Sequence, residues 1–129
     1  AELQGRPLSS AKEYNTAIRA LGKQRAWKRA LALLPEMRRQ GVEASTVTYN
    51  VGISACGQGE QWALALLLLE EMERQLTEPD EVTFNSLISA CGRSSKWASA
   101  LQLLAELSPR RIEASDYTFN AAISACEKG

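Results

Sequence analysis

The amino-acid sequence repeats itself with a period of 35 residues, and this periodicity constrains the fold more than any other feature. An aromatic residue followed by Asn recurs without a slip at 14–15, 49–50, 84–85 and 119–120. Trp recurs in the same register at 27, 62 and 97, and Ala at 20, 55, 90 and 125. Periods of this length are typical of stacked structural repeats, so we expect a row of similar units.

The first half of each repeat has the pattern of an amphipathic helix. Tyr49, Ile53 and Cys56 follow one another at spacings of four and three, which place their side chains on one helix face. Gly57 and Gly59 come next and predict a turn after this helix. The third repeat follows the same plan.

The second half of each repeat predicts another helix. In the second repeat it runs from about 62 to 75, with Leu66 and Leu69 at helical spacing. Pro79 then ends the unit, because proline disfavours further helix. Pro35 falls inside the corresponding helix of the first repeat, where it is expected to cause a kink. The Trp residues open these second helices and are expected to pack between units.

These repeats divide the chain into a lead at 1–10, full units at 11–45, 46–80 and 81–115, and the first helix of a partial fourth unit at 116–129. One helix pair cannot bury both of its apolar faces alone, so about three stacked units are needed for a stable core. The expected fold class is therefore all-α, a solenoid of helix–turn–helix repeats.

The composition argues against several classes of function. The chain has no His, which removes the commonest general base and the usual catalytic triads. Its three Cys lie 35 residues apart, at 56, 91 and 126, and are expected to be small buried residues rather than a disulfide or metal site. We predict no enzyme activity, no metal site and no cofactor. The longest apolar run, 62–69, falls short of the ~20 residues that cross a membrane, so a soluble chain is expected.

Particular motifs indicate a family. The segments Val47-Thr48-Tyr49-Asn50 and Val82-Thr83-Phe84-Asn85, the pair Pro79-Asp80 and the 35-residue period resemble the pentatricopeptide repeat family over residues 11–129. The tetratricopeptide repeat is the nearest alternative, but its period is 34 and its Trp lies in the first helix. The resemblance implies a right-handed α-solenoid of a plastid or mitochondrion that binds single-stranded RNA, one base per repeat, in RNA processing, stability or translation.

In that family, an Asn in the first helix and the last residue of the same repeat together read one base. The resemblance assigns this role to Asn15 with Ser45, Asn50 with Asp80, Asn85 with Ser115, and Asn120 as the start of a further pair. Asn with Asp prefers U in the family and Asn with Ser prefers C, which implies a 5′-C-U-C-3′ preference. The family position that sandwiches neighbouring bases is occupied by Val47 and Val82, and in the outer units by Lys12 and Tyr117.

Formal net charge is zero, so an RNA-binding function requires basic residues to be concentrated on one surface. Positions four and eight after each Asn share its helix face. The basic residues at these positions are Arg19, Lys23, Arg93 and Lys128, and the family uses this surface to contact phosphate. Gln58 replaces the basic residue in the second repeat. We therefore expect a mildly basic groove and weak RNA binding.

Two alternatives to base reading stay open. The repeated Asn is also consistent with a structural consensus inherited without RNA contact. The neutral charge and Gln58 fit a scaffold subunit that binds protein within an organellar complex, such as a ribosome or a photosynthetic assembly, because helical repeats often dock peptides.

Overall fold

The structure, a computed structural model, describes the backbone of residues 10–128 and the side chains of residues 10–127. All regular secondary structure in this part of the chain is α-helical, which confirms the predicted fold class. The helices are α1 (Ala11–Lys23), α2 (Trp27–Arg39), α3 (Thr46–Gln58), α4 (Trp62–Arg74), α5 (Glu81–Arg93), α6 (Trp97–Glu106) and α7 (Asp116–Lys128).

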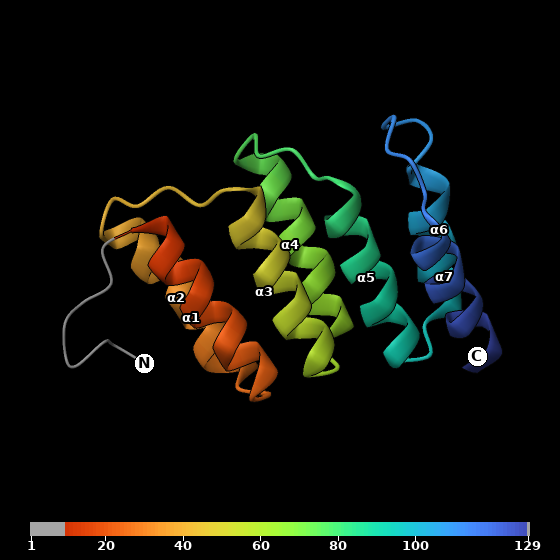
Figure 1. Cartoon of the computed structure of the whole chain (residues 1–129), viewed down its shortest axis with the longest axis horizontal. Helices are drawn as coiled ribbons and strands as arrows, with labels where there is room; N and C mark the ends of the chain where they lie inside the picture. Colours follow the sequence, from red (N-terminus) through yellow and green to blue (C-terminus); the bar gives the residue numbers. More distant parts are fainter. Residues whose placement is uncertain (1–9, 129) are drawn as a thin grey trace.

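The helices follow one another along the long axis of the molecule in sequence order, with α1 and α2 at one end and α6 and α7 at the other (Figure 1). The first helix of each repeat packs against the first helix of the next, which forms the row α1, α3, α5 and α7. Each of α2, α4 and α6 packs against the first helix of its own repeat and that of the next. This pattern of nearest-neighbour contacts is that of a solenoid.

The first helices approach one another closely at a glycine that faces an alanine. A Cβ atom added to Gly22 would lie 3.0 Å from the Cβ of Ala55, and one added to Gly57 would lie 3.1 Å from that of Ala90. Gly57 therefore serves close packing between helices. The prediction of a turn at Gly57 is wrong, because α3 continues to Gln58 and the chain turns only after it.

First helices begin at side chains that cap them. Ser10, Ser45 and Asp80 each accept the N–H of the residue three positions later, which satisfies one of the free donors of the first turn. At Ser45 and Asp80, the hydroxyl of the threonine three residues later accepts a hydrogen bond from the backbone N–H of the capping residue, which completes a capping box. The second helices α2, α4 and α6 begin without a side-chain cap, so their position depends on packing.

The core consists of apolar residues from both helices of each repeat. Tyr49, Ile53 and Cys56 of α3 are buried against Leu69 and Met72 of α4. The same face of α5 is buried against α6. In α7, however, Cys126 is exposed, so the prediction that all three Cys are buried is wrong for this residue. Among the described residues, no helix packs over that face of α7.

Contacts between repeats extend to the second helices. The ring of Trp27 lies against Gly59, and the Lys96 ammonium lies 5.2 Å from the centre of the Trp62 ring, which confirms that these two Trp side chains pack between units. Trp97 is about half exposed.

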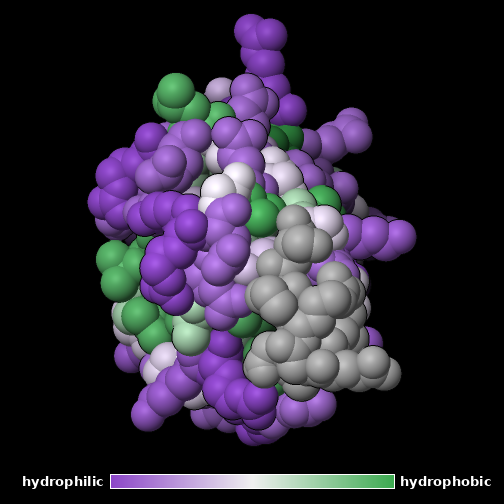
Figure 2. All heavy atoms as spheres, turned by 90° about the vertical axis from the view of Figure 1, so that its left-hand side faces the viewer, coloured by the Kyte–Doolittle hydropathy of each residue, from purple (hydrophilic) through white to green (hydrophobic). Residues whose placement is uncertain are grey.

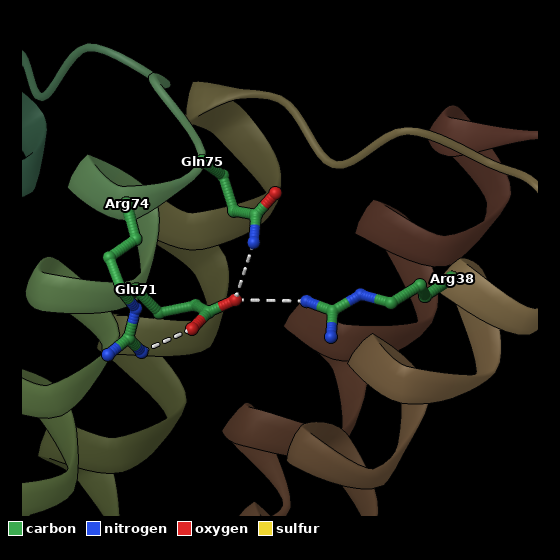
Figure 3. A network of polar contacts seen from close by, with 4 residues as sticks. All are labelled: Arg38, Glu71, Arg74 and Gln75. Atoms are coloured by element: carbon green, nitrogen blue, oxygen red, sulfur yellow. Dashed lines mark hydrogen bonds and ion pairs between the residues drawn. The ribbon is translucent and has the colours of Figure 1, made fainter.

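Four polar side chains connect α2 to α4 on the outside of the stack. The carboxylate of Glu71 accepts hydrogen bonds from Arg38 at 2.9 Å, Arg74 at 2.5 Å and Gln75 at 3.2 Å (Figure 3). The hydrogen bond from Arg74 is the main cause that lowers the pKa of Glu71. Helix α2 runs from Trp27 to Arg39 through Pro35, and the kink at that residue stays a prediction.

Candidate nucleic-acid interface

A groove of about 430 Å³ crosses the exposed side of α1, α3 and α5. Its lining brings together several of the residues that the sequence singled out, although they come from three helices and the turn before the third. These are Arg19, Lys23, Val47, Asn50, Asp80 and Val82. Gln58, the last residue of α3, lines the same groove, so the expected interruption of the basic positions lies within it.

A second hollow of about 300 Å³ lies between α5 and α7. It brings Arg93 together with Asn120 and with Tyr117, whose hydroxyl lies 3.1 Å from Ser89 Oγ. The predicted residues Asn15, Ser45, Asn85 and Ser115 line neither hollow. The side chain of Lys128 lies outside the described residues.

The two residues of the central pair meet across 30 positions of sequence. Asn50 Nδ2 donates a hydrogen bond of 3.1 Å to Asp80 Oδ1, which joins the two members of the central pair directly. Asp80 lies immediately before α5 and caps it. The chain path of one helical hairpin therefore returns the last residue of the repeat to the Asn of its first helix.

A threonine of the next repeat bridges the two members of each pair. Thr83 Oγ1 accepts the N–H of Asp80 at 3.0 Å and donates to Asn50 Oδ1 at 2.5 Å. Thr48 makes the same two bonds with Ser45 and Asn15, at 3.0 and 2.7 Å.

Thr118 repeats this arrangement with Ser115 at 3.1 Å and Asn85 at 2.5 Å. Sequence reasoning missed these three threonines as members of the site. The signal that identifies them is their own 35-residue recurrence, directly before the aromatic residue and Asn of α3, α5 and α7; α1 has Glu13 at this position.

The central Asn is the most enclosed of the four. Asn50 is only 7% exposed, whereas Asn15 and Asn85 are partly buried and Asn120 is exposed. Its Oδ1 accepts from Thr83 and one Nδ2 hydrogen is directed to Asp80. Because an amide nitrogen carries two hydrogens, one donor remains to meet a ligand in the groove.

The groove combines exposed cations with apolar ridges. Arg19 and Lys23 of the groove are exposed, and so is Arg93 in the second hollow. Val47 and Val82 are about half exposed and line the groove between repeats. Hydrophilic residues also cover most of the end face near α1 and α2 that Figure 2 shows, with apolar residues only in separate patches. The groove, with its exposed cations and its valine ridges, can accept an anionic chain and pack flat groups between the ridges.

The described residues contain no group of three or more His, Cys, Asp or Glu positioned to hold a metal ion. Burial raises the pKa of the Cys56 thiol to about 12 and that of Cys91 to about 11, so neither supplies a thiolate near neutral pH. No helix of the described part is long and apolar enough to cross a membrane.

A family model described as PPR repeat family matches the chain at residues 11–58, 44–93 and 79–128. The chain belongs to the pentatricopeptide repeat family. Its fold is the right-handed α-solenoid of that family, as the comparison with solved structures shows.

Two solved structures of the pentatricopeptide repeat protein PPR10 illustrate the likeness. PPR10 in complex with an 18-nt psaJ RNA element has 34% sequence identity and a TM-score of 0.82 to this chain, and the match covers 94% of this chain and 18% of that one. PPR10 from maize has 34% identity and a TM-score of 0.80, with 95% and 18% covered. The chain thus corresponds to less than a fifth of the length of PPR10. No curated protein matches it.

Proposed function

We propose that this chain is a sequence-selective module for single-stranded RNA with a 5′-C-U-C-3′ preference. The observation that carries the proposal is the groove across α1, α3 and α5, where Asn50 and Asp80 meet between two valine ridges with Arg19 and Lys23 alongside. The similarity to PPR10, which has been solved in complex with an 18-nt RNA element, supports RNA as the ligand.

The central pair has the hydrogen-bonding character that suits uracil. The carboxylate of Asp80 is an acceptor when ionised, and all of its hydrogen bonds within the described residues engage Oδ1. Its Oδ2 can therefore accept the N3–H of uracil, while the remaining Nδ2 hydrogen of Asn50 donates to a uracil carbonyl. Cytosine has an unprotonated N3, which would meet the carboxylate as one acceptor facing another.

The outer pairs differ by a hydroxyl in place of the carboxylate. Ser45 and Ser115 can donate a hydrogen bond as well as accept one. A hydroxyl donor suits the N3 acceptor of cytosine, so the pairs with Asn15 and Asn85 favour C. The exchange of one acceptor for one donor is the proposed source of selectivity.

Affinity of this chain for RNA is expected to be weak and dependent on salt. Few cations line the groove, and each phosphate contact contributes a counterion-release slope of about −0.7 for single strands. Fluorescence anisotropy with an oligonucleotide that contains C-U-C should show tighter binding than with poly-A at the same ionic strength. Equal binding of the two would overturn the proposed selectivity.

The sharpest variant is Asp80→Ser, which converts the central pair into a copy of the outer ones and keeps a residue that can cap α5. We expect preference to move from C-U-C to C-C-C, with little change in the melting temperature. Lys23→Ala is the matched control, since it should weaken binding to all sequences alike. An unchanged preference in Asp80→Ser would show that Asp80 does not read the base.

We further propose that the module acts on transcripts of a plastid or mitochondrion, in RNA processing, stability or translation. Family membership supports this setting. Crosslinking of the tagged full-length protein to RNA in fractionated organelles tests it, because recovery of only cytosolic transcripts would exclude the setting.

A protein scaffold within an organellar complex is the second candidate function. The observation that favours it is the exposed apolar face of α7, where Phe119 is 49% and Ile123 is 56% exposed. Association with a protein complex that persists after ribonuclease treatment would support the scaffold, provided that Asp80→Ser leaves it unchanged. Loss of that association on ribonuclease treatment would count against it.

A further inference from the structure

Three buried threonines hydrogen-bond to the reading pairs but line neither of the two hollows. Thr48, Thr83 and Thr118 are each 0% exposed and lie where the first helix of one repeat packs on that of the previous repeat. Each makes a hydrogen bond to the Asn of the previous repeat, between residues 33 positions apart. Each first helix therefore places a hydroxyl behind the reading residue of its neighbour.

The direction of these hydrogen bonds follows from the number of hydrogens available. A threonine hydroxyl has one hydrogen, and its oxygen already accepts the backbone N–H of the capping residue, which is Asp80 in the case of Thr83. The single hydroxyl hydrogen has to be given to an acceptor, because a buried donor without a partner is costly. At Thr83 two acceptors lie within reach of the hydroxyl, Asn50 Oδ1 at 2.5 Å and Asp80 Oδ1 at 3.0 Å, and the shorter contact is the one to Asn50.

This bond determines which end of the asparagine amide meets a ligand. With Oδ1 of Asn50 held against Thr83, Nδ2 donates to Asp80 Oδ1, which itself lies 3.0 Å from Thr83 Oγ1. A rotated amide would offer an acceptor in place of a donor. Such a change alters which base edge the pair can bind.

We propose that Thr48, Thr83 and Thr118 are positioning residues that orient the asparagine amide of the preceding repeat and thereby set its base preference. The proposal rests on the proposed function, and it adds that the specificity of one repeat is determined partly by a residue of the next. The threonine acts through asparagine and is not itself expected to contact RNA.

The orientation is tested first without RNA. Thr83→Val removes the hydroxyl at nearly constant volume, whereas Thr83→Ser keeps it. In ¹⁵N NMR spectra, the side-chain amide of Asn50 should shift and exchange faster with water in Thr83→Val, and it should return to the wild-type position in Thr83→Ser. An unchanged amide signal in Thr83→Val would overturn the proposal.

The consequence for specificity is then measured with oligonucleotides that differ only at the central base of C-U-C. In Thr83→Val, the ratio of the affinities for U and C should fall by about five- to tenfold, which corresponds to the loss of one oriented hydrogen bond. Thr83→Ser should restore the wild-type ratio. Thr118→Val is the matched control, because it should relax selectivity at the last C and leave the central base unaffected.

The two proposals fail in different ways in this experiment. A wild-type chain that does not distinguish U from C at the central position overturns the proposed base reading, and with it the role of the threonines in specificity. A selective wild-type chain whose Thr83→Val variant is equally selective, but melts at a lower temperature, overturns only the threonine proposal and leaves Thr83 as a helix cap.

Discussion

Helices α5 and α7 share much of their sequence but lie in different environments. Both contain Thr-Phe-Asn, at 83–85 and 118–120, and Ile-Ser-Ala-Cys, at 88–91 and 123–126. In α5 the side chains of Phe84, Ile88 and Cys91 are fully buried. The corresponding side chains of α7 are exposed, with the aromatic ring and the isoleucine each about half accessible to solvent.

The face of each helix that packs on the preceding repeat is equally buried in α5 and α7. Thr118 and Ala125 of α7 are as buried as Thr83 and Ala90 of α5, because each helix packs on the first helix of the preceding repeat. The difference therefore arises only where α5 meets α6 and the next repeat. Burial of the repeated motif is decided by the neighbouring helix and not by the motif.

The largest expected difference is in the energetic cost of truncating the repeated isoleucine. Ile88→Ala should lower the free energy of unfolding by about 2–5 kcal/mol, because it removes buried methyl groups and leaves a cavity. Ile123→Ala should change it by less than about 0.5 kcal/mol. Urea denaturation followed by circular dichroism measures both. Equal losses would show that the exposed face of α7 is covered in solution.

The repeated cysteines provide a second test of the same contrast. Cys126 is exposed and should react with a thiol reagent in the native protein at pH 8. Cys56 and Cys91 should react at least about 100-fold more slowly than Cys126. Both are buried, and burial raises their pKa values to about 12 and about 11. Mass spectrometry of timed samples assigns each site, and urea should make the three rates similar. Rapid labelling of Cys91 without urea would contradict this packing.

The glycines between first helices should respond in opposite directions. Gly22→Ala would place a Cβ 3.0 Å from that of Ala55, so α1 and α3 must separate and stability should fall by about 1–3 kcal/mol. Gly92 has ordinary contact distance to Ala125, 3.5 Å, and Gly92→Ala should raise stability by up to about 1 kcal/mol through better helix propensity. The melting temperatures of the two variants show whether stability changes in opposite directions. A lower melting temperature in both variants would mean that α5 and α7 pack as tightly as α1 and α3.

The smallest effect is expected for the ion pairs on the second helices. Glu71→Gln, in the middle of the molecule, should lower the free energy of unfolding by at most about 1 kcal/mol, because the partners Arg38 and Arg74 are largely exposed. The lowered pKa of Glu71 means that this contribution is present at neutral pH and is lost as pH falls through the folded-state pKa. Glu73→Gln, which removes the pair with Arg110 nearer the C-terminal end, is the matched variant. Thermal unfolding at low and high salt should show a smaller difference from wild type at high salt.

Several features of the fold and candidate site followed from local pattern. The helix pairs and the shared face of Asn50 and the basic positions follow from helical geometry and the 35-residue period. Two expectations were wrong because they depend on contacts between repeats. Gly57 lies in a helix against Ala90 and not in a turn, and Cys126 is exposed because no helix of the described part packs on its face.

The sequence by itself determined the repeat length, the helical class and the register in which equivalent residues recur, because these depend on spacings along one chain. Only the tertiary structure decided which copies of a motif are buried, and it alone showed that Thr83 lies behind Asn50. The physical reason is that both depend on how one helix packs on another, about 35 residues away, and hydrogen-bond geometry at that range cannot be read from local spacing.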